Sequence, residues 1–286
     1  MHKFSLLVSH YDRLFIVENP IWKYLADPFI LISEENKLVV LAEEFDRFKK
    51  KGELISITIT GFSTNELFVS KKVLISEDFH LSFPAPYFVE GEFYILPESS
   101  EIEKLLLYKL DIPNLKIIKK LDLSEGHFVD PVIYSDGQSN YLSWYTGSGN
   151  SDGITVAQKI DLSKFLNGEF IYDSFKCKKL SDYRAAGKIN LNGYRPAQSS
   201  ETFYGGGLFF EENSKYNSVS ILNNIKTPPS ILSKINTELS HHFDINGHSW
   251  CIDFCLKSYT HFSKNVILKR LNLDSLGKEI KFININ

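Results

Sequence analysis

Cysteine is scarce in this sequence of 286 residues, which contains three: Cys177, Cys251 and Cys255. A small, odd number of thiols provides no disulfide framework and fits a protein of a reducing compartment. Cys251 and Cys255 are four residues apart in a strand-like segment, where they share one face at a separation of about 13 Å. That separation is too large for two ligands of one zinc ion. The sequence therefore predicts no metal site and a cytoplasmic protein.

Long apolar runs and an excess of one charge are also missing. No run approaches 18 apolar residues, so no transmembrane helix is expected, and the first ten residues do not resemble a secretory signal. The 32 basic and 35 acidic residues nearly balance, at a formal charge of -3. Nucleic acid is therefore not an expected partner. The 22 Phe and 14 Tyr are compatible with a homodimer formed through exposed aromatic side chains.

Sustained helical periodicity is absent, apart from weak candidates at residues 162–166 and 229–235. Short strand-like segments follow one another instead, and turn pairs such as Asp136-Gly137 and Asn246-Gly247 separate them. Groups of these segments recur about every 40 to 55 residues, a period typical of propellers. The sequence predicts an all-β fold, a five-bladed β-propeller in a single domain over residues 1–286. The N-terminal strands at 4–8 and 13–17 are expected to pair with residues 278–283 and close the ring.

Two Asp-Pro pairs, Asp27-Pro28 and Asp130-Pro131, each precede a strand-like apolar run. Proline disfavours the helical region for the residue before it and has no backbone donor, so each aspartate is expected to be extended at the entrance of a strand. On the inner strands of two blades, both carboxylates would face one central funnel, as glycosyl chemistry requires. The alternative is that each aspartate caps a turn.

Several further motifs follow in a fixed order. They are Glu-Glu-Phe at 43–45, His-Leu-Ser-Phe-Pro at 80–84, Pro-Glu-Ser at 97–99, Arg-Ala-Ala-Gly at 184–187, Arg-Pro-Ala-Gln at 195–198 and Tyr-Gly at 204–205. With the two Asp-Pro pairs, this order resembles the propeller domain at the N-terminus of plant glucosamine inositolphosphorylceramide transferases, over residues 20–255. Stand-alone bacterial relatives of that domain belong to surface-polysaccharide synthesis. The last blade departs from the family, because relatives tend to read Gly-x-His-Thr where this chain reads Ser240-His241-His242-Phe243.

That family resembles, more distantly, the five-bladed propeller glycosidases of the arabinanase and β-xylosidase type. The resemblance implies that Asp27 is a general base, that Asp130 is a second aspartate tuning pKa and orientation, and that a glutamate is the general acid. We predict Glu98 as the acid, with Glu43 and Glu44 as alternatives, because a general acid needs a raised pKa. The alternative role for Glu98 is a buried ion pair with an arginine, Arg184 or Arg195.

The remaining motif residues supply hydrogen-bonding groups that suit a sugar or a nucleotide sugar. These predicted substrate-binding residues are Glu44, His80, Ser82, Ser99, Arg184, Arg195, Gln198, Tyr204 and His242. Two arginines in one funnel favour an anionic ligand such as the diphosphate of a nucleotide sugar. For His80 the alternative is a structural hydrogen bond, and for Tyr204 it is a tight turn with the glycines that follow.

Three functions remain open at this stage. We favour a glycosyltransferase of surface-polysaccharide biosynthesis that uses a nucleotide-sugar donor and a glycan acceptor. The alternatives are a glycoside hydrolase with Asp/Asp/Glu acid–base catalysis and a glycan-binding propeller without catalysis. No cofactor is predicted, although a divalent cation bridging the donor diphosphate is compatible with Asp27, Glu98 and Asp130 gathered together.

Overall fold

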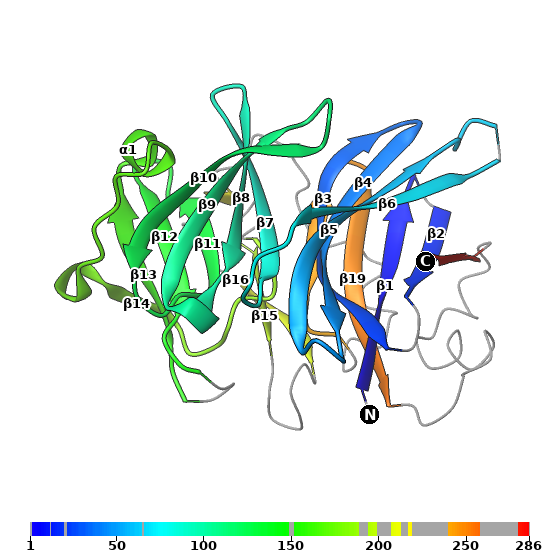
Figure 1. The fold of residues 1–286 in the computed structure, drawn as a ribbon. Helices are drawn as coiled ribbons and strands as arrows, with labels where there is room; N and C mark the ends of the chain where they lie inside the picture. The colour runs from blue at the N-terminus through cyan, green and yellow to red at the C-terminus, as the bar shows by residue number, and fades with distance from the viewer. Residues whose placement is uncertain are drawn as a thin grey trace.

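A computed structural model describes residues 2–11, 13–19, 22–64, 66–148, 152–188, 194–198, 207–212, 217–218, 240–257 and 280–285. The regular structure of these residues is almost entirely β-strand. The strands form sheets that follow one another along the chain (Figure 1). None of the helices in the described residues combines the length and the apolar character needed to cross a membrane.

The first two sheets are antiparallel meanders of four strands each. The first consists of β3 (Lys23–Glu34), β4 (Lys37–Asp46), β5 (Lys51–Thr60) and β6 (Phe68–Ile75). The second consists of β7 (Ser82–Val89), β8 (Glu92–Glu98), β9 (Lys104–Asp111) and β10 (Lys116–Glu125), with the 3-10 helix η1 (Ser100–Ile102) between β8 and β9. The sequence does not predict β6, because this edge strand is largely exposed and lacks a continuous apolar run.

The third sheet has five strands, in the order β14-β13-β12-β11-β17. They are β11 (Val129–Ser135), β12 (Asn140–Tyr145), β13 (Thr155–Ile160), β14 (Lys178–Ser181) and β17 (Asn217–Ser218). Helix α1 (Leu162–Leu166) and the 3-10 helix η2 (Ser174–Lys176) lie between β13 and β14. The helix predicted at 162–166 is confirmed, and Asp161 caps it by accepting the Lys164 amide. The second helical candidate, 229–235, lies outside the described residues.

The last sheet joins the two ends of the chain. Its order is β18 (Phe243–Asn246), β19 (Ser249–Lys257), β1 (His2–His10), β2 (Arg13–Glu18) and β20 (Ile280–Asn284). Strand β1 pairs antiparallel with β19 and β2, and β20 pairs parallel with β2 (Figure 1). The two N-terminal strands, β1 and β2, therefore lie between strands from the last part of the chain, with β19 on one side and β20 on the other.

The sheets surround a common centre as the blades of an all-β propeller in one domain. Inner strand β7 contacts both β3 and β11, and β18 contacts β3. One apolar cluster extends from β3 through the second and third sheets to α1, and another joins β1 and β19 to the first sheet. Four sheets have four or five strands, whereas β15 (Tyr194–Gln198) and β16 (Leu208–Glu212) form a sheet of two.

Three inner strands carry the same β-bulge. An extra residue interrupts the pairing of β3, β7 and β11 with the strand that follows each of them. The residue before the proline at each bulge has a positive φ: +50° at Asp27, +50° at Phe83 and +47° at Asp130. The prediction of an extended backbone at the two aspartates is therefore wrong, and Asp27 lies inside β3 rather than before it. The bulge accommodates a proline that cannot donate to the ladder, and it places the preceding residue in the left-handed region.

Candidate functional site

The bulges direct three backbone amides toward carboxylates of the preceding sheet around the propeller. The amide of Asp27 donates to Asp253 Oδ2 at 3.1 Å, and the amide of Phe83 donates to Asp27 Oδ2 at 3.2 Å. The amide of Asp130 donates to Glu98 Oε2, also at 3.1 Å. Buried amides need acceptors. Each of these carboxylates therefore helps to hold two neighbouring sheets together at the centre.

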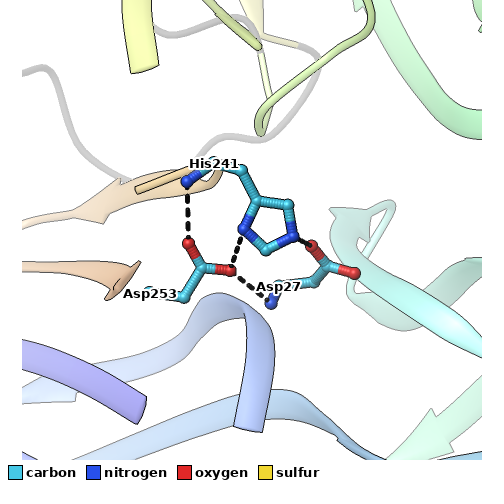
Figure 2. Close-up of side chains that lie close together, drawn as sticks. All are labelled: Asp27, His241 and Asp253. Atoms are coloured by element: carbon cyan, nitrogen blue, oxygen red, sulfur yellow. Dashed lines mark hydrogen bonds and ion pairs between the residues drawn. The ribbon is translucent and has the colours of Figure 1, made fainter. Parts of the chain in front are cut away.

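His241 lies between two of these carboxylates (Figure 2). Its Nδ1 is 2.7 Å from Asp253 Oδ2, and its Nε2 is 3.5 Å from Asp27 Oδ1. Burial lowers the pKa of His241, but the charge and hydrogen bond of Asp253 outweigh burial and raise the pKa to about 9. At neutral pH the ring is therefore an imidazolium between two carboxyl groups.

Asp27, His241 and Asp253 are also candidate metal ligands. Among the described residues, one imidazole nitrogen and one oxygen of each carboxylate lie within 4.8 Å of one another, which is the kind of cluster that could hold a metal ion. The two nitrogens of His241 face different carboxylates, so the three side chains form a chain and not a shell around one point. The cation that the sequence left open required Asp27, Glu98 and Asp130. Asp130 instead binds the guanidinium group of Arg184.

Arg184 binds Asp130 with two parallel hydrogen bonds. Its Nε is 2.8 Å from Oδ2 and its Nη2 is 3.0 Å from Oδ1, while Nη2 also lies 3.7 Å from Glu98 Oε2. Gln198 Nε2 contacts Asp130 Oδ2 at 3.5 Å. Burial raises the pKa of Asp130 to about 7 against the opposing effect of Arg184. The alternative reading of Glu98, an ion pair with an arginine, is thus realised with Arg184.

Glu43 is a second buried carboxyl group near Asp27. It lies opposite Ala26 in the pairing of β3 with β4, and its Oε1 has no hydrogen-bond partner among the described residues. Burial raises the pKa of Glu43 well above its usual range, and neighbouring negative charges add to the effect. Those charges belong to Asp27, Glu98 and Asp253. Glu43 therefore holds its proton more tightly than an ordinary glutamate does.

His80 covers Glu43, and Gly52 makes this arrangement possible. His80 Nδ1 accepts the Gly52 amide at 2.8 Å, so the proton of the neutral ring is on Nε2, which lies 3.8 Å from Glu43 Oε1. A Cβ at position 52 would lie 2.6 Å from Glu43 Oε1 and 2.8 Å from His80 Cε1. The His80 side chain is 29% exposed and that of Glu43 is 7% exposed, so His80 is the more accessible of the two.

Glu44 points away from this group. Its carboxylate accepts hydrogen bonds from Asn19 (2.7 Å), Lys23 (2.5 Å) and Lys71 (2.8 Å). Burial raises the pKa of Glu44, but these donors outweigh burial and leave the pKa below its usual range. Neighbouring strand residues face opposite sides, so Glu43 and Glu44 belong to different environments.

Arg195 is buried in structural contacts. Its Nη1 is 2.5 Å from Glu211 Oε2, and its Nη2 donates to Thr155 Oγ1 at 3.0 Å and to the Tyr183 carbonyl at 2.9 Å. These bonds connect β15 with β16 and β13. Both arginines that were predicted to bind an anionic ligand, Arg184 and Arg195, are therefore bound to carboxylates of the protein itself.

His242 is completely buried beside the central chain of side chains. Its Nδ1 lies 3.7 Å from Asp27 Oδ1, and its ring packs against Phe29 and Phe83 with centroid distances of 4.4 and 5.3 Å. Burial lowers the pKa of His242 to about 3, so the ring is neutral. It therefore adds no charge to the centre.

The two predicted serines are also buried. Ser99 donates to the Lys104 carbonyl at 2.5 Å, and Ser82 pairs with Glu98 in the register of β7 with β8. Ser99 thus has a structural partner, and Ser82 lies next to the acidic centre. Tyr204 lies outside the described residues.

Sequence reasoning missed two members of the centre, His241 and Asp253. Asp253 is fully buried within the apolar run of β19, and a carboxylate in such a run was the available signal. For His241 the available signal was the departure from the family pattern at Ser240-His241-His242-Phe243.

The comparisons with known proteins agree with the propeller fold. The family described as "Glucosamine inositolphosphorylceramide transferase 1, N-terminal" matches residues 18–248. Glucosamine inositolphosphorylceramide transferase 1 of Arabidopsis thaliana is 27% identical over 130 residues, which are 45% of this chain and 16% of that protein. The match thus spans less than a fifth of this relative.

Solved structures with similar folds include glycosidases. The structure of RS223-β-xylosidase has a TM-score of 0.50 and 12% identity, and the match covers 91% of this chain and 97% of that chain. The Bacteroides ovatus xyloglucan PUL GH43B structure has a TM-score of 0.42 and 9% identity, over 80% of this chain and 55% of that chain. At such low identity the β-xylosidase likeness concerns the fold alone.

Proposed function

Because the chain belongs to the family of the N-terminal region of glucosamine inositolphosphorylceramide transferase 1, we propose that it acts on a glycosyl bond at its buried carboxyl groups by general acid–base catalysis. The name of the relative is that of a transferase, which relates the family to glycosyl transfer. A carbohydrate is accordingly the ligand class we assign to the centre of the propeller.

The contrast between Asp27 and Glu43 carries this proposal. The neighbouring carboxylates raise the pKa of Glu43 well above its usual range, whereas the His241 imidazolium opposes the rise for Asp27, whose pKa is about 7. An acid and a base need opposite protonation states at the working pH, and different surroundings provide them. These two carboxyl groups therefore fit the roles of general acid and general base.

In the proposed step, Glu43 donates its proton to the glycosidic oxygen as the bond from that oxygen to the anomeric carbon breaks. Asp27 accepts the proton of an incoming hydroxyl group, from water or a sugar, as the new carbon–oxygen bond forms. We assign the role of acid to Glu43 and not to the predicted Glu98, because the Glu98 carboxyl group is engaged by other groups of the protein. Glu98 accepts the Asp130 amide and the Ser100 hydroxyl and lies near Arg184.

The sequence favours a glycosyltransferase that uses a nucleotide-sugar donor. The word transferase in the family description supports this form of the reaction. The arginines do not add support. Arg184 is engaged by Asp130, and Arg195 is engaged by Glu211. We therefore place hydrolysis or sugar-to-sugar transfer before transfer from a nucleotide diphosphate.

We also infer that β15 and β16 belong to a further blade between the third sheet and the last, which would give five blades over residues 1–286. Two contacts support this. Arg195 of β15 bonds to Thr155 of β13, and the amide of Phe243 donates to the Ala186 carbonyl at 2.7 Å. Both contacts support a position of the segment around β15 between these two sheets.

The test is turnover of aryl glycosides by the purified chain. The panel contains pentosides, hexosides, N-acetylhexosaminides and hexuronides, with water or a free sugar as acceptor, and nucleotide sugars are assayed in parallel. We expect release of the aryl alcohol that falls by about 100-fold or more in Asp27→Asn and in Glu43→Gln. Glu77→Gln is the control, because Glu77 bonds to Tyr108 and Lys120 away from the centre.

Two results would overturn the acid–base proposal. One is turnover that survives both Asp27→Asn and Glu43→Gln, including transfer from a nucleotide sugar. The other is binding of oligosaccharides, followed by thermal shift, without turnover of any substrate in the panel. The second result would leave a glycan-binding propeller, in which the central carboxylates hold the blades together.

A further inference from the structure

We propose that His241 and Asp253 are a positioning pair for the general base: Asp253 orients His241 so that its Nε2–H points at Oδ1 of Asp27. This inference rests on the function proposed above. The inference assigns a role to two residues that had no predicted role. His241 and Asp253 contact each other, and both contact Asp27.

The contacts of Asp253 hold its carboxylate in one orientation. Its Oδ1 accepts the amides of His241 (3.1 Å) and His242 (3.0 Å), and its Oδ2 accepts the amide of Asp27 at 3.1 Å. The same Oδ2 lies 2.7 Å from His241 Nδ1 (Figure 2). A carboxylate held in this way fixes the orientation of an imidazole ring and the position of its protons.

The two oxygens of Asp27 have different partners. Oδ2 accepts the amide of Phe83 at 3.2 Å, whereas Oδ1 lies 3.5 Å from His241 Nε2 (Figure 2). His242 Nδ1 also lies near Oδ1, at 3.7 Å, but that ring is neutral. His241 therefore brings its positive charge to the Oδ1 side of the base, where it stabilises the ionised carboxylate.

Several other charged or titratable groups act on Asp27 or on its partners. From the surrounding strands and loops these are Glu43, Glu98, Asp130, Arg184, His242 and Asp253. Burial raises the pKa of Asp27 to about 7, Asp253 and Asp130 act in the same direction, and His241 is the largest opposing influence. Without the imidazolium, Asp27 would hold its proton at neutral pH and could not act as a base.

The experiment compares pH–rate profiles of the whole chain with those of His241→Gln and Asp253→Asn. We expect the acidic limb, on which the base must lose its proton, to move to higher pH by about one pH unit or more in His241→Gln. It should move less in Asp253→Asn, because loss of the Asp253 charge itself lowers the pKa of Asp27. In His241→Gln the rate at pH 6 should then fall about fivefold more than the rate at pH 8. An acidic limb that stays in place in His241→Gln would overturn the proposal.

Asp244→Asn is the matched control for loss of a buried aspartate. Asp244 accepts the Ile30 amide at 2.9 Å and lies 3.6 Å from Lys188 Nζ, away from His241. This variant should lose stability without moving the acidic limb. A limb that moves equally in Asp244→Asn would assign the effect to general loosening and would overturn the positioning role.

A second measurement needs no turnover and therefore separates this proposal from the proposed function. In ¹⁵N-histidine-labelled protein, NMR should show His241 protonated at pH 7 and losing its proton near pH 9, with His242 neutral as an internal reference. Asp253→Asn should make His241 neutral at pH 7. A wild-type His241 that is neutral at pH 7 would overturn the pairing, whereas failure of every substrate would overturn the reaction alone.

Discussion

Two adjacent glutamates of β4 have opposite electrostatic surroundings. Glu43 is buried among carboxylates and has a raised pKa, whereas Glu44 is held by two lysines and an asparagine and has a lowered pKa. Strand alternation separates them, because successive side chains point to opposite faces. One side chain is suited to donate a proton, and the other is suited to anchor strands.

This difference predicts opposite pH dependence for Glu43→Gln and Glu44→Gln. The pKa of Glu43 is raised in the folded state, so the folded protein binds more protons than the unfolded chain and loses stability as pH rises above about 4.5. Glu43→Gln removes that loss, so the free energy of unfolding of the variant relative to wild type should increase from pH 4 to pH 8.

Glu44→Gln is the matched counterpart. The pKa of Glu44 is lowered in the folded state, so its stabilising contribution is present above the unfolded pKa and is lost as pH falls. The variant should be less stable than wild type by about 1–2 kcal/mol at pH 8, with a smaller difference at pH 4. Urea denaturation at both pH values checks the pair. The same direction of change in both variants would contradict the assignment.

Among the elements, the inner strands repeat one backbone feature with different side chains. The bulge before proline occurs at Asp27, Phe83 and Asp130, so an acid is not required to form it. The sequence shows the two Asp-Pro pairs, and the apolar runs after them predict strands. It does not show the positive φ, because the bulge arises from pairing with the next strand and from the amide acceptors of the neighbouring sheet. The conformational preferences of single residues do not predict the strand pairing or these acceptors.

Part of the site was predictable, because some of its residues stand in sequence motifs. Asp27 and Asp130 stand in recognisable motifs and meet at the centre, and Glu98 and Arg184 join them there. The roles of His241 and Asp253 were not predicted, because their contacts with Asp27 form only when the last sheet packs beside the first. The sequence predicted that Arg195 binds an anionic ligand, but in the folded protein Arg195 forms an ion pair with Glu211.

The close approach of β5 to β4 and to the loop before β7 predicts a specific cost for Gly52→Ala. A Cβ there would lie 2.5 Å from the Leu81 carbonyl oxygen and 2.6 Å from Glu43 Oε1. We expect a loss of about 1–3 kcal/mol in chemical denaturation, because the backbone oxygen cannot move freely. Gly137→Ala is the control, since a Cβ at position 137 meets nothing within 4 Å and the cost there comes from its φ of +86° alone.

The two glycine variants should also differ at the centre. Gly52→Ala should shift the NMR signals of the His80 ring, because position 52 contacts that ring, whereas Gly137→Ala should leave them in place. Unchanged His80 signals and wild-type stability in Gly52→Ala would show that β5 has room for a side chain, and would contradict the crowding described for this strand.

For the whole molecule, the stability of the ring depends on the sheet that contains both chain ends. Strand β1 lies between β19 and β2, and Leu7 of β1 is fully buried opposite Ile252 and Ile16. Leu7→Ala should therefore cost about 2–5 kcal/mol and lower the melting temperature of the entire protein in one transition. Calorimetry checks this, with Val73→Ala on exposed strand β6 as a control that should change little. A separate early transition in Leu7→Ala would show that the last sheet unfolds independently.

Asp27 and Asp253 are 226 positions apart in the chain, yet they are hydrogen-bonded at the junction of the first and last sheets. A ribosome therefore makes His241 and Asp253 more than two hundred residues after Asp27. A growing polypeptide therefore carries no assembled acid–base centre until translation has passed residue 253. Under the proposed mechanism, chains that stop before residue 253 would therefore lack the pair of side chains that positions Asp27.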